Sequence, residues 1–117
     1  VIISNTSNET REKLIDIQKH QKGGLSGKPI EDKSNLLINK FYKLIKNKIK
    51  IIGVGGVDSG LSAYNKFLAG ADYIQLYTGM VYKGPNIVNI IKNDLRKILI
   101  KEGVKNFTEI VGNKSKL

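Results

Sequence analysis

Two adjacent glycines in the middle of the chain have the setting of an anion-binding turn. Residues 50–54 have the apolar, β-branched composition of a strand, Gly55 and Gly56 follow directly, and residues 61–69 have the composition of a short helix. Glycines between a strand and a helix let backbone N–H groups face an anion, whose charge the helix dipole favours. The spacing is not G-x-G-x-x-G, so a Rossmann dinucleotide site is not indicated.

The next predicted strand, residues 72–77, ends in a similar way. Its last residue is Tyr77, and Thr78 and Gly79 follow as a polar, glycine-containing turn. Two successive strand ends of this type resemble the phosphate site of (β/α)8 barrels, which is built after the last two strands. The sequence therefore predicts phosphate binding here. The alternative that the glycines only make tight turns stays open.

Several kinds of catalytic site are excluded by composition. The chain has no cysteine and one histidine, His20, so disulfides, thiolate metal sites and a cysteine nucleophile are ruled out. A zinc site or a serine–histidine–acid triad would depend on that single histidine, which lies among lysines and is interpreted as solvated. We expect no metal site.

The elements that must position the glycine turns alternate along the chain. Strands are predicted at residues 1–4, 50–54 and 72–77. Helices are predicted at residues 34–48 with Ser34 as N-cap, at 61–69 closed by Gly70, and at 87–100 after Gly84-Pro85, with shorter helical turns at 10–21 and 106–111. This order indicates an α/β fold with parallel strands and helical crossovers. Three βα units are too few for a closed eight-stranded barrel of about 250 residues but suit its last third.

The charge and hydropathy of the chain limit the classes of partner that we expect it to bind. The net charge is +10, but 18 of the 20 basic residues are lysine, whereas bidentate recognition of bases and phosphates favours arginine. We therefore expect no nucleic-acid partner and interpret the lysines as a solvated surface. No run reaches the ~18 apolar residues of a membrane span, so no membrane anchor is predicted in this chain.

Four motifs in order resemble the dihydroorotate dehydrogenase family. Residues 51–71 read IIGVGGVDSGLSAYNKFLAGA and resemble its C-terminal signature; the other three are Ser4-Asn5-Thr6, residues 23–29 (GGLSGKP), and residues 75–79 (QLYTG) with 82–85 (YKGP). The resemblance covers residues 1 to about 100. The Leu-Ser-Gly of the glycine loop and Tyr77 resemble the membrane-associated, quinone-using class. The implied fold is the C-terminal part, about three βα units, of a TIM barrel.

The resemblance also implies roles for particular residues. Ser4 and Gly27 would approach the flavin of flavin mononucleotide (FMN), and Gly56, Tyr77 and Thr78 would hold its phosphate, largely through backbone N–H groups. Asn5 and Thr6 would hydrogen-bond the pyrimidine substrate, since an amide offers both a donor and an acceptor. From the residues alone, a turn-forming asparagine is the favoured interpretation of Asn5.

The complete enzyme implied by this family oxidises dihydroorotate to orotate in pyrimidine (UMP) biosynthesis and reduces a membrane quinone. It would lie peripherally on the inner, cytoplasmic face of a membrane. The family's catalytic serine lies upstream of the strand matched by residues 1–4, so no catalytic residue is assigned here. With Val1 as its first residue, the chain is interpreted as one incomplete segment, 1–117, that needs the N-terminal part of the barrel. The alternatives are an inactive remnant or a half-barrel phosphate- or flavin-binding module that needs a partner chain.

Overall fold

Three short parallel strands form the centre of the molecule. The computed structural model describes residues 1–9, 11–45 and 48–113. The strands β1 (Ile2–Ile3), β2 (Ile52–Val54) and β3 (Tyr73–Gln75) lie in the order β1-β2-β3, and both pairings are parallel. The α/β fold with parallel strands that the sequence predicts is confirmed.

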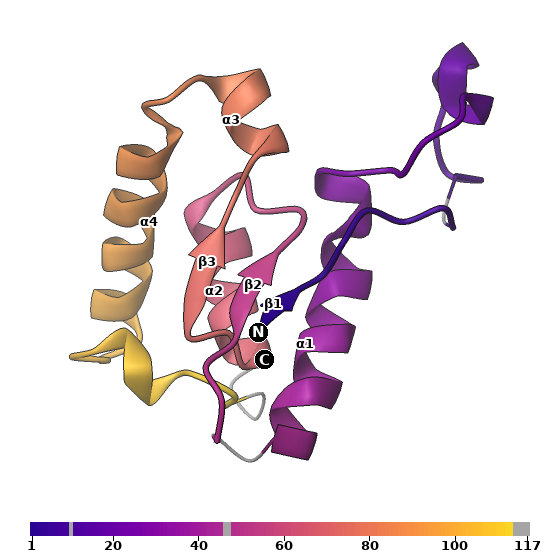
Figure 1. Cartoon of the computed structure of the whole chain (residues 1–117). Coiled ribbons are helices and arrows are strands. Elements are labelled where there is room, and N and C mark those ends of the chain that lie inside the picture. The colour runs from indigo at the N-terminus through magenta and orange to yellow at the C-terminus, as the bar shows by residue number, and fades with distance from the viewer. Residues whose placement is uncertain (10, 46–47, 114–117) are drawn as a thin grey trace.

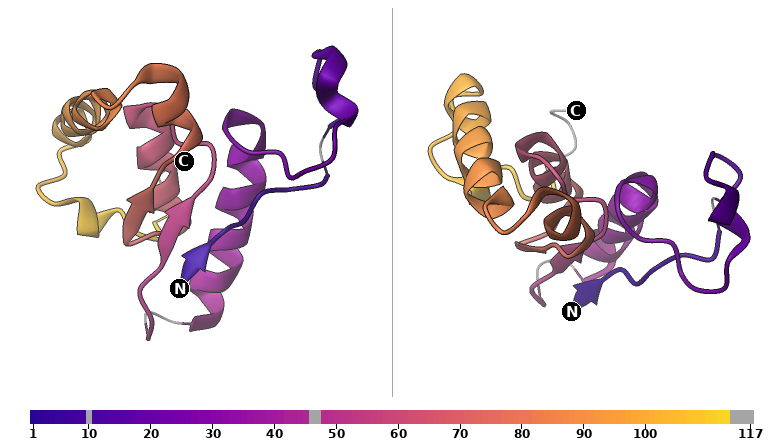
Figure 2. Two further views of the ribbon diagram at one scale, coloured as in Figure 1. Left: turned by 45° about the horizontal axis from the view of Figure 1, so that its top comes forward. Right: turned by 90° about the horizontal axis from the view of Figure 1, so that it is seen from above.

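The helices lie to one side of the sheet. The main helices are α1 (Glu31–Ile45), α2 (Gly60–Ala69), α3 (Thr78–Lys83) and α4 (Ile87–Lys101); the short 3-10 turns are η1 (Ile17–His20), η2 (Lys28–Ile30) and η3 (Phe107–Glu109). Helix α2 packs against both α1 and α4 and lies between them (Figure 1). The view from above shows the same order of the three long helices (Figure 2).

The two faces of the sheet differ in burial. Ile3, Gly53 and Ile74 are register partners, and Ile3 packs in a cluster with Ile38 of α1. The other row joins Ile2, Ile52 and Tyr73, of which Ile2 is 59% exposed and Tyr73 58% exposed. Side chains alternate between the faces of a strand, so this second row points away from the helices. In the part of the chain described, that face of the sheet is largely uncovered.

Local signals define the ends of α2 as predicted. The Ser59 side chain accepts a hydrogen bond from the N–H of Ser62 while the Ser62 hydroxyl accepts one from the N–H of Ser59, which is a reciprocal capping box. At the other end Gly70 adopts a φ of 120° and stops the helix. Helix α4 begins at Ile87 as predicted and ends one residue beyond the predicted range.

Several local predictions are wrong. Residue 10 lies outside the described residues, and within 11–21 the helical turn is the 3-10 turn η1, which is shorter than the predicted range; Ile15 and Ile17 are almost fully exposed. Helix α1 starts at Glu31 after η2, so Ser34 is a buried helical residue and not an N-cap. It ends at Ile45, and residues 46–47 of the predicted helix lie outside the described part.

Two short elements also differ from prediction. Helix α3 was not predicted, because six residues containing Gly79 carry too little periodicity to be recognised. Residues 106–111 contain only the 3-10 turn η3, and Pro85 precedes the N-cap Asn86 of α4. None of the described helices is long and apolar enough to cross a membrane.

A buried tyrosine hydroxyl gives a stability prediction. Tyr64 belongs to the apolar cluster between α2 and α4, and its Oη has no hydrogen-bond partner among the described residues. Burial raises the pKa of this hydroxyl. Because an unsatisfied buried hydroxyl costs free energy, we expect Tyr64→Phe to raise the free energy of unfolding by about 1 kcal/mol in urea denaturation.

A second tyrosine supplies the control. The hydroxyl of Tyr42 donates to the backbone oxygen of Val111 at 3.3 Å. Tyr42→Phe loses that hydrogen bond and should lower the free energy of unfolding. If Tyr64→Phe destabilises the chain as much as Tyr42→Phe does, the Tyr64 hydroxyl has a partner and the prediction fails.

Candidate functional site

One hollow lies where the three parallel strands end. Its volume is about 790 Å³, and it is lined by residues that follow each strand together with the glycine loop before α1. All seven residues that the sequence assigns to a site line it: Ser4, Asn5, Thr6, Gly27, Gly56, Tyr77 and Thr78. The carboxyl edge of a parallel sheet is the usual place for a ligand in α/β proteins. The structure brings these residues together; their individual roles remain predictions.

The glycine turn after β2 is held tightly against α1. Gly55 and Gly56 have φ angles of +112° and +78°, which side-chain-bearing residues rarely adopt. A Cβ at Gly56 would lie 2.5 Å from Cβ and 2.7 Å from Cα of Glu31. Only glycine fits here, and its backbone passes along the hollow without a side chain to obstruct it.

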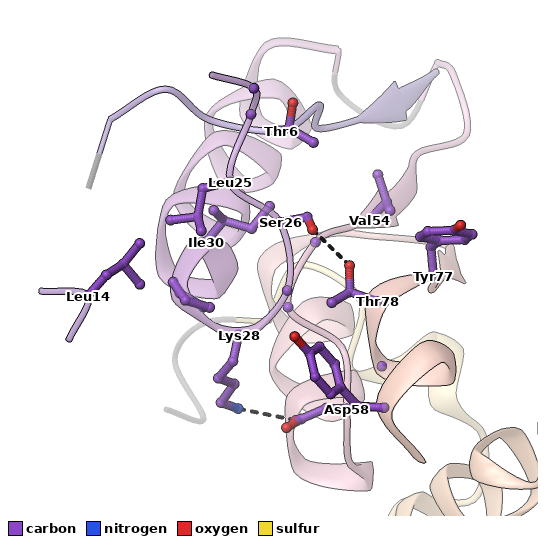
Figure 3. Close-up of a pocket in the computed structure, with 18 of the residues that line it drawn as sticks. Thr6, Leu14, Leu25, Ser26, Lys28, Ile30, Val54, Asp58, Tyr77 and Thr78 are labelled. Atoms are coloured by element: carbon purple, nitrogen blue, oxygen red, sulfur yellow. Dashed lines mark hydrogen bonds and ion pairs between the residues drawn. The ribbon is translucent and has the colours of Figure 1, made fainter. Parts of the chain in front are cut away.

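The strand end after β3 meets the glycine loop directly. The Thr78 hydroxyl donates to the Ser26 hydroxyl oxygen at 2.9 Å (Figure 3). A Cβ at Gly27, which has a φ of +80°, would lie 2.9 Å from Cγ2 of Thr78. Thr78 begins α3, so its backbone N–H has no acceptor within that helix. Tyr77 lies at the rim and is exposed.

The segment after β1 is positioned by an antiparallel bridge. Ser7 and Leu25 exchange two backbone hydrogen bonds of 2.9 and 2.7 Å. As a result Gly24 packs against Thr6, where a Cβ would lie 1.9 Å from the Thr6 hydroxyl oxygen. Asn5 Oδ1 accepts a hydrogen bond of 2.8 Å from the N–H of Thr6. The amide nitrogen is the donor group of the Asn5 side chain.

Arg11 holds together the arm, residues 11–23, which connects the segment after β1 to the glycine loop. The Arg11 guanidinium donates to the backbone oxygens of Lys19, at 2.9 Å, and Gln21, at 2.5 Å, and also to that of Gly23. A guanidinium has five N–H donors in a rigid fork, which suits it to gathering several carbonyls. Sequence reasoning missed this role, because the three acceptors are backbone atoms that no side-chain pattern reveals.

Three charged side chains that line the hollow, Lys28, Asp58 and Lys83, were also missed. Lys28 Nζ lies 3.3 Å from a carboxylate oxygen of Asp58 (Figure 3). It also lies 2.5 Å from a carboxylate oxygen of Glu31. Lys83 donates to the backbone oxygen of Asp58 at 2.9 Å, and its Nζ lies 3.8 Å from the Asp58 carboxylate. Lys28 and Lys83 both occur within motifs recognised in the sequence. Their charges indicated no function, because only the fold shows that they lie beside the glycine turn.

These charges shift two pKa values. Partial burial works to raise the pKa of Asp58, but the charges of Lys28 and Lys83 outweigh it and hold that pKa below its ordinary value. The hydrogen bond to Glu31 raises the pKa of Lys28. Asp58 and Lys28 therefore both stay ionised around neutral pH. The two lysines are available to an anion only in competition with Asp58 and Glu31.

Comparison with known proteins gives consistent matches. A family model described as dihydroorotate dehydrogenase matches residues 1–99. A Deinococcus radiodurans protein named dihydroorotate dehydrogenase (quinone) is 43% identical over 112 residues, which cover 96% of this chain and 30% of that protein. The mitochondrial dihydroorotate dehydrogenase (quinone) of Mus musculus is 40% identical over 112 residues, which cover 96% and 28%.

A solved structure agrees with the sequence matches. The crystal structure of ligand-free type DHODH from Eimeria tenella superposes with a TM-score of 0.92 at 35% identity. The match covers 97% of this chain and 31% of that one. The chain thus spans about 30% of the length of the relatives that it matches.

Proposed function

The chain belongs to the dihydroorotate dehydrogenase family, and from that membership we propose that it forms the C-terminal part of a quinone-dependent enzyme that oxidises dihydroorotate to orotate in pyrimidine (UMP) biosynthesis. The observation that carries the proposal is the convergence of seven residues, from all three strand ends and the glycine loop, on one hollow. The quinone-dependent relatives support the subclass. A quinone substrate in turn implies that the complete enzyme works at a membrane surface, and we propose that this is the inner, cytoplasmic face.

The open face of the sheet supports a barrel. Ile2 and Tyr73 are exposed on the side away from the helices, and β1 and β3 are the edges of the sheet. Unpaired edges and an uncovered apolar face favour association with further strands. We propose that residues 1–117 form one segment of a (β/α)8 barrel whose remaining strands come from elsewhere in the polypeptide or from another chain. Taken alone, the segment is expected to be marginally stable.

Gly56, Tyr77 and Thr78 are proposed to hold the phosphate of FMN. The fit rests on backbone without side-chain obstruction at Gly56 and on the N–H of Thr78, which has no acceptor within α3. Lys28 and Lys83 add positive charge nearby. Ser4 and Gly27, which both line the hollow, are proposed to contact the flavin. When bound, the flavin supplies the acceptor for the hydride that leaves dihydroorotate.

Asn5 and Thr6 are proposed to orient the pyrimidine. The Asn5 oxygen accepts from Thr6, and its amide nitrogen is a donor that suits a carbonyl oxygen on the ring edge. We assign no proton-transfer step to this chain and propose that the catalytic base comes from another part of the barrel. The chain's own contribution is to bind the phosphate and part of the substrate.

Flavin binding tests this assignment. We expect the purified chain to bind FMN at least tenfold more tightly than riboflavin, which lacks the phosphate, in a calorimetric titration. Inorganic phosphate should compete with FMN and not with riboflavin. Equal affinity for the two flavins would contradict a phosphate site formed by this chain.

Activity needs the rest of the barrel. Co-expression with the amino-terminal part of the Deinococcus radiodurans relative should give dihydroorotate-dependent reduction of a dye, whereas this chain alone should give none. FMN binding without activity in the assembled pair would favour the half-barrel binding module. The absence of both would favour the inactive remnant.

A further inference from the structure

Lys66 of α2 is a buried cation outside the hollow. Its exposed fraction is 0%, and its aliphatic stem lies against β2, where a Cβ at Gly53 would approach Lys66 Cγ to 2.8 Å. Among the described residues, no carboxylate forms a salt bridge with its ammonium group. A buried ammonium group without a carboxylate partner is costly, so its hydrogen bonds indicate what it does.

Those hydrogen bonds lead to α1 and then to the site. Lys66 Nζ donates to Asn35 Oδ1 at 2.7 Å and to Ser34 Oγ at 3.2 Å. The Ser34 hydroxyl in turn donates to the backbone oxygen of Val54 at 2.6 Å. An ammonium group cannot accept a hydrogen bond, so Ser34 must accept from Lys66 and direct its single proton to Val54.

The backbone oxygen of Val54 lies directly before the glycine turn and is held by hydrogen bonds. It also accepts a hydrogen bond of 3.3 Å from the N–H of Ser4, which ties it to the segment after β1. The next two residues are Gly55 and Gly56, which pack against α1. The conformation of the turn therefore depends on that packing and on how firmly the peptide before it is held.

We propose that Lys66 and Ser34 are positioning residues that fix the Val54 peptide and so preorganise the Gly55–Gly56 turn for an anionic phosphate group. Lys66 acts through Ser34 and does not touch the ligand. This inference rests on the proposed phosphate site. It adds to that site two residues on the helix side of the sheet that hold the turn in place. Ser34 also packs on Gly55, where a Cβ would lie 3.3 Å from Ser34 Oγ.

The test uses two variants and a matched control. Lys66→Met keeps the aliphatic stem and removes the donor, and Ser34→Ala removes the hydroxyl. Leu99→Ala is the control, because Leu99 packs in the cluster between α2 and α4 and lines no part of the hollow. Amide ¹⁵N relaxation of Gly55 and Gly56 is measured in each variant, together with the affinities for FMN and riboflavin.

We expect Lys66→Met and Ser34→Ala each to lower the order parameters of Gly55 and Gly56 from about 0.85 toward about 0.6. Both should weaken FMN binding about tenfold and leave riboflavin binding unchanged. Leu99→Ala should change neither quantity. Unchanged order parameters in both variants, or changes no larger than in Leu99→Ala, would overturn the inference. If the wild-type chain does not prefer FMN, the phosphate proposal fails while the relaxation data still decide whether the relay holds the turn.

Discussion

Gly56→Ala is expected to abolish the preference for FMN over riboflavin and to lower the free energy of unfolding by about 3 kcal/mol. Two causes add. A φ of +78° costs an alanine about 1 kcal/mol, and forcing a methyl group into packed atoms typically costs a further 1–3 kcal/mol. The contact is with the backbone of Glu31 at the start of α1, which cannot swing aside. Urea denaturation and flavin titration measure the two effects.

Gly103→Ala is the control for this prediction. Gly103 also has a positive φ, +69°, but a Cβ there would meet no atom within 4 Å. Its cost should be limited to the backbone term of about 1 kcal/mol. If Gly56→Ala costs no more than Gly103→Ala, the close approach to α1 does not constrain the turn. If Gly56→Ala lowers stability but the FMN preference survives, Gly56 serves only the tight turn.

Stability should rise with pH above neutrality because of Lys66. Burial lowers the pKa of Lys66 from 10.5 to about 8; Glu31 works to raise it, and Lys28 works to lower it. Between these two pH values the unfolded chain binds the proton more strongly than the folded chain does. As the pH rises, the stabilisation that the unfolded chain gains from binding this proton decreases, and the free energy of unfolding therefore increases. The gain should be about 2 kcal/mol between pH 7 and pH 9.5.

The comparison with Lys66→Met isolates this effect. Other groups titrate near the upper end of the range, including Tyr64, whose buried hydroxyl has a raised pKa, and Lys50, whose pKa Asp72 raises. Their contributions are common to the wild type and the variant and cancel in the difference. The wild-type stability minus the Lys66→Met stability should rise over the range. A flat difference would mean that Lys66 keeps its ordinary pKa in the folded chain.

Local patterns were enough to predict much of the fold. Helix α4 was predicted because its apolar residues repeat with the helical period over four turns, and α2 because Gly70 marks its end. The parallel sheet followed from the alternation of these helices with short β-branched runs. By contrast, the apolar residues at 14, 15 and 17 suggested a helix but lie in an arm that Arg11 holds through backbone oxygens.

The sequence by itself determined the order of strands and helices, the glycine turns at two strand ends and the motifs of the family. Each of these depends on torsional preferences and periodicity within a few neighbouring residues. Only the tertiary structure decided that Ser34 is a buried donor to Val54 and that Lys66, one lysine among eighteen, is enclosed. It also decided that Lys28 and Lys83 meet at Asp58. Burial and pairing of this kind arise from contacts between distant segments, and no local pattern encodes them.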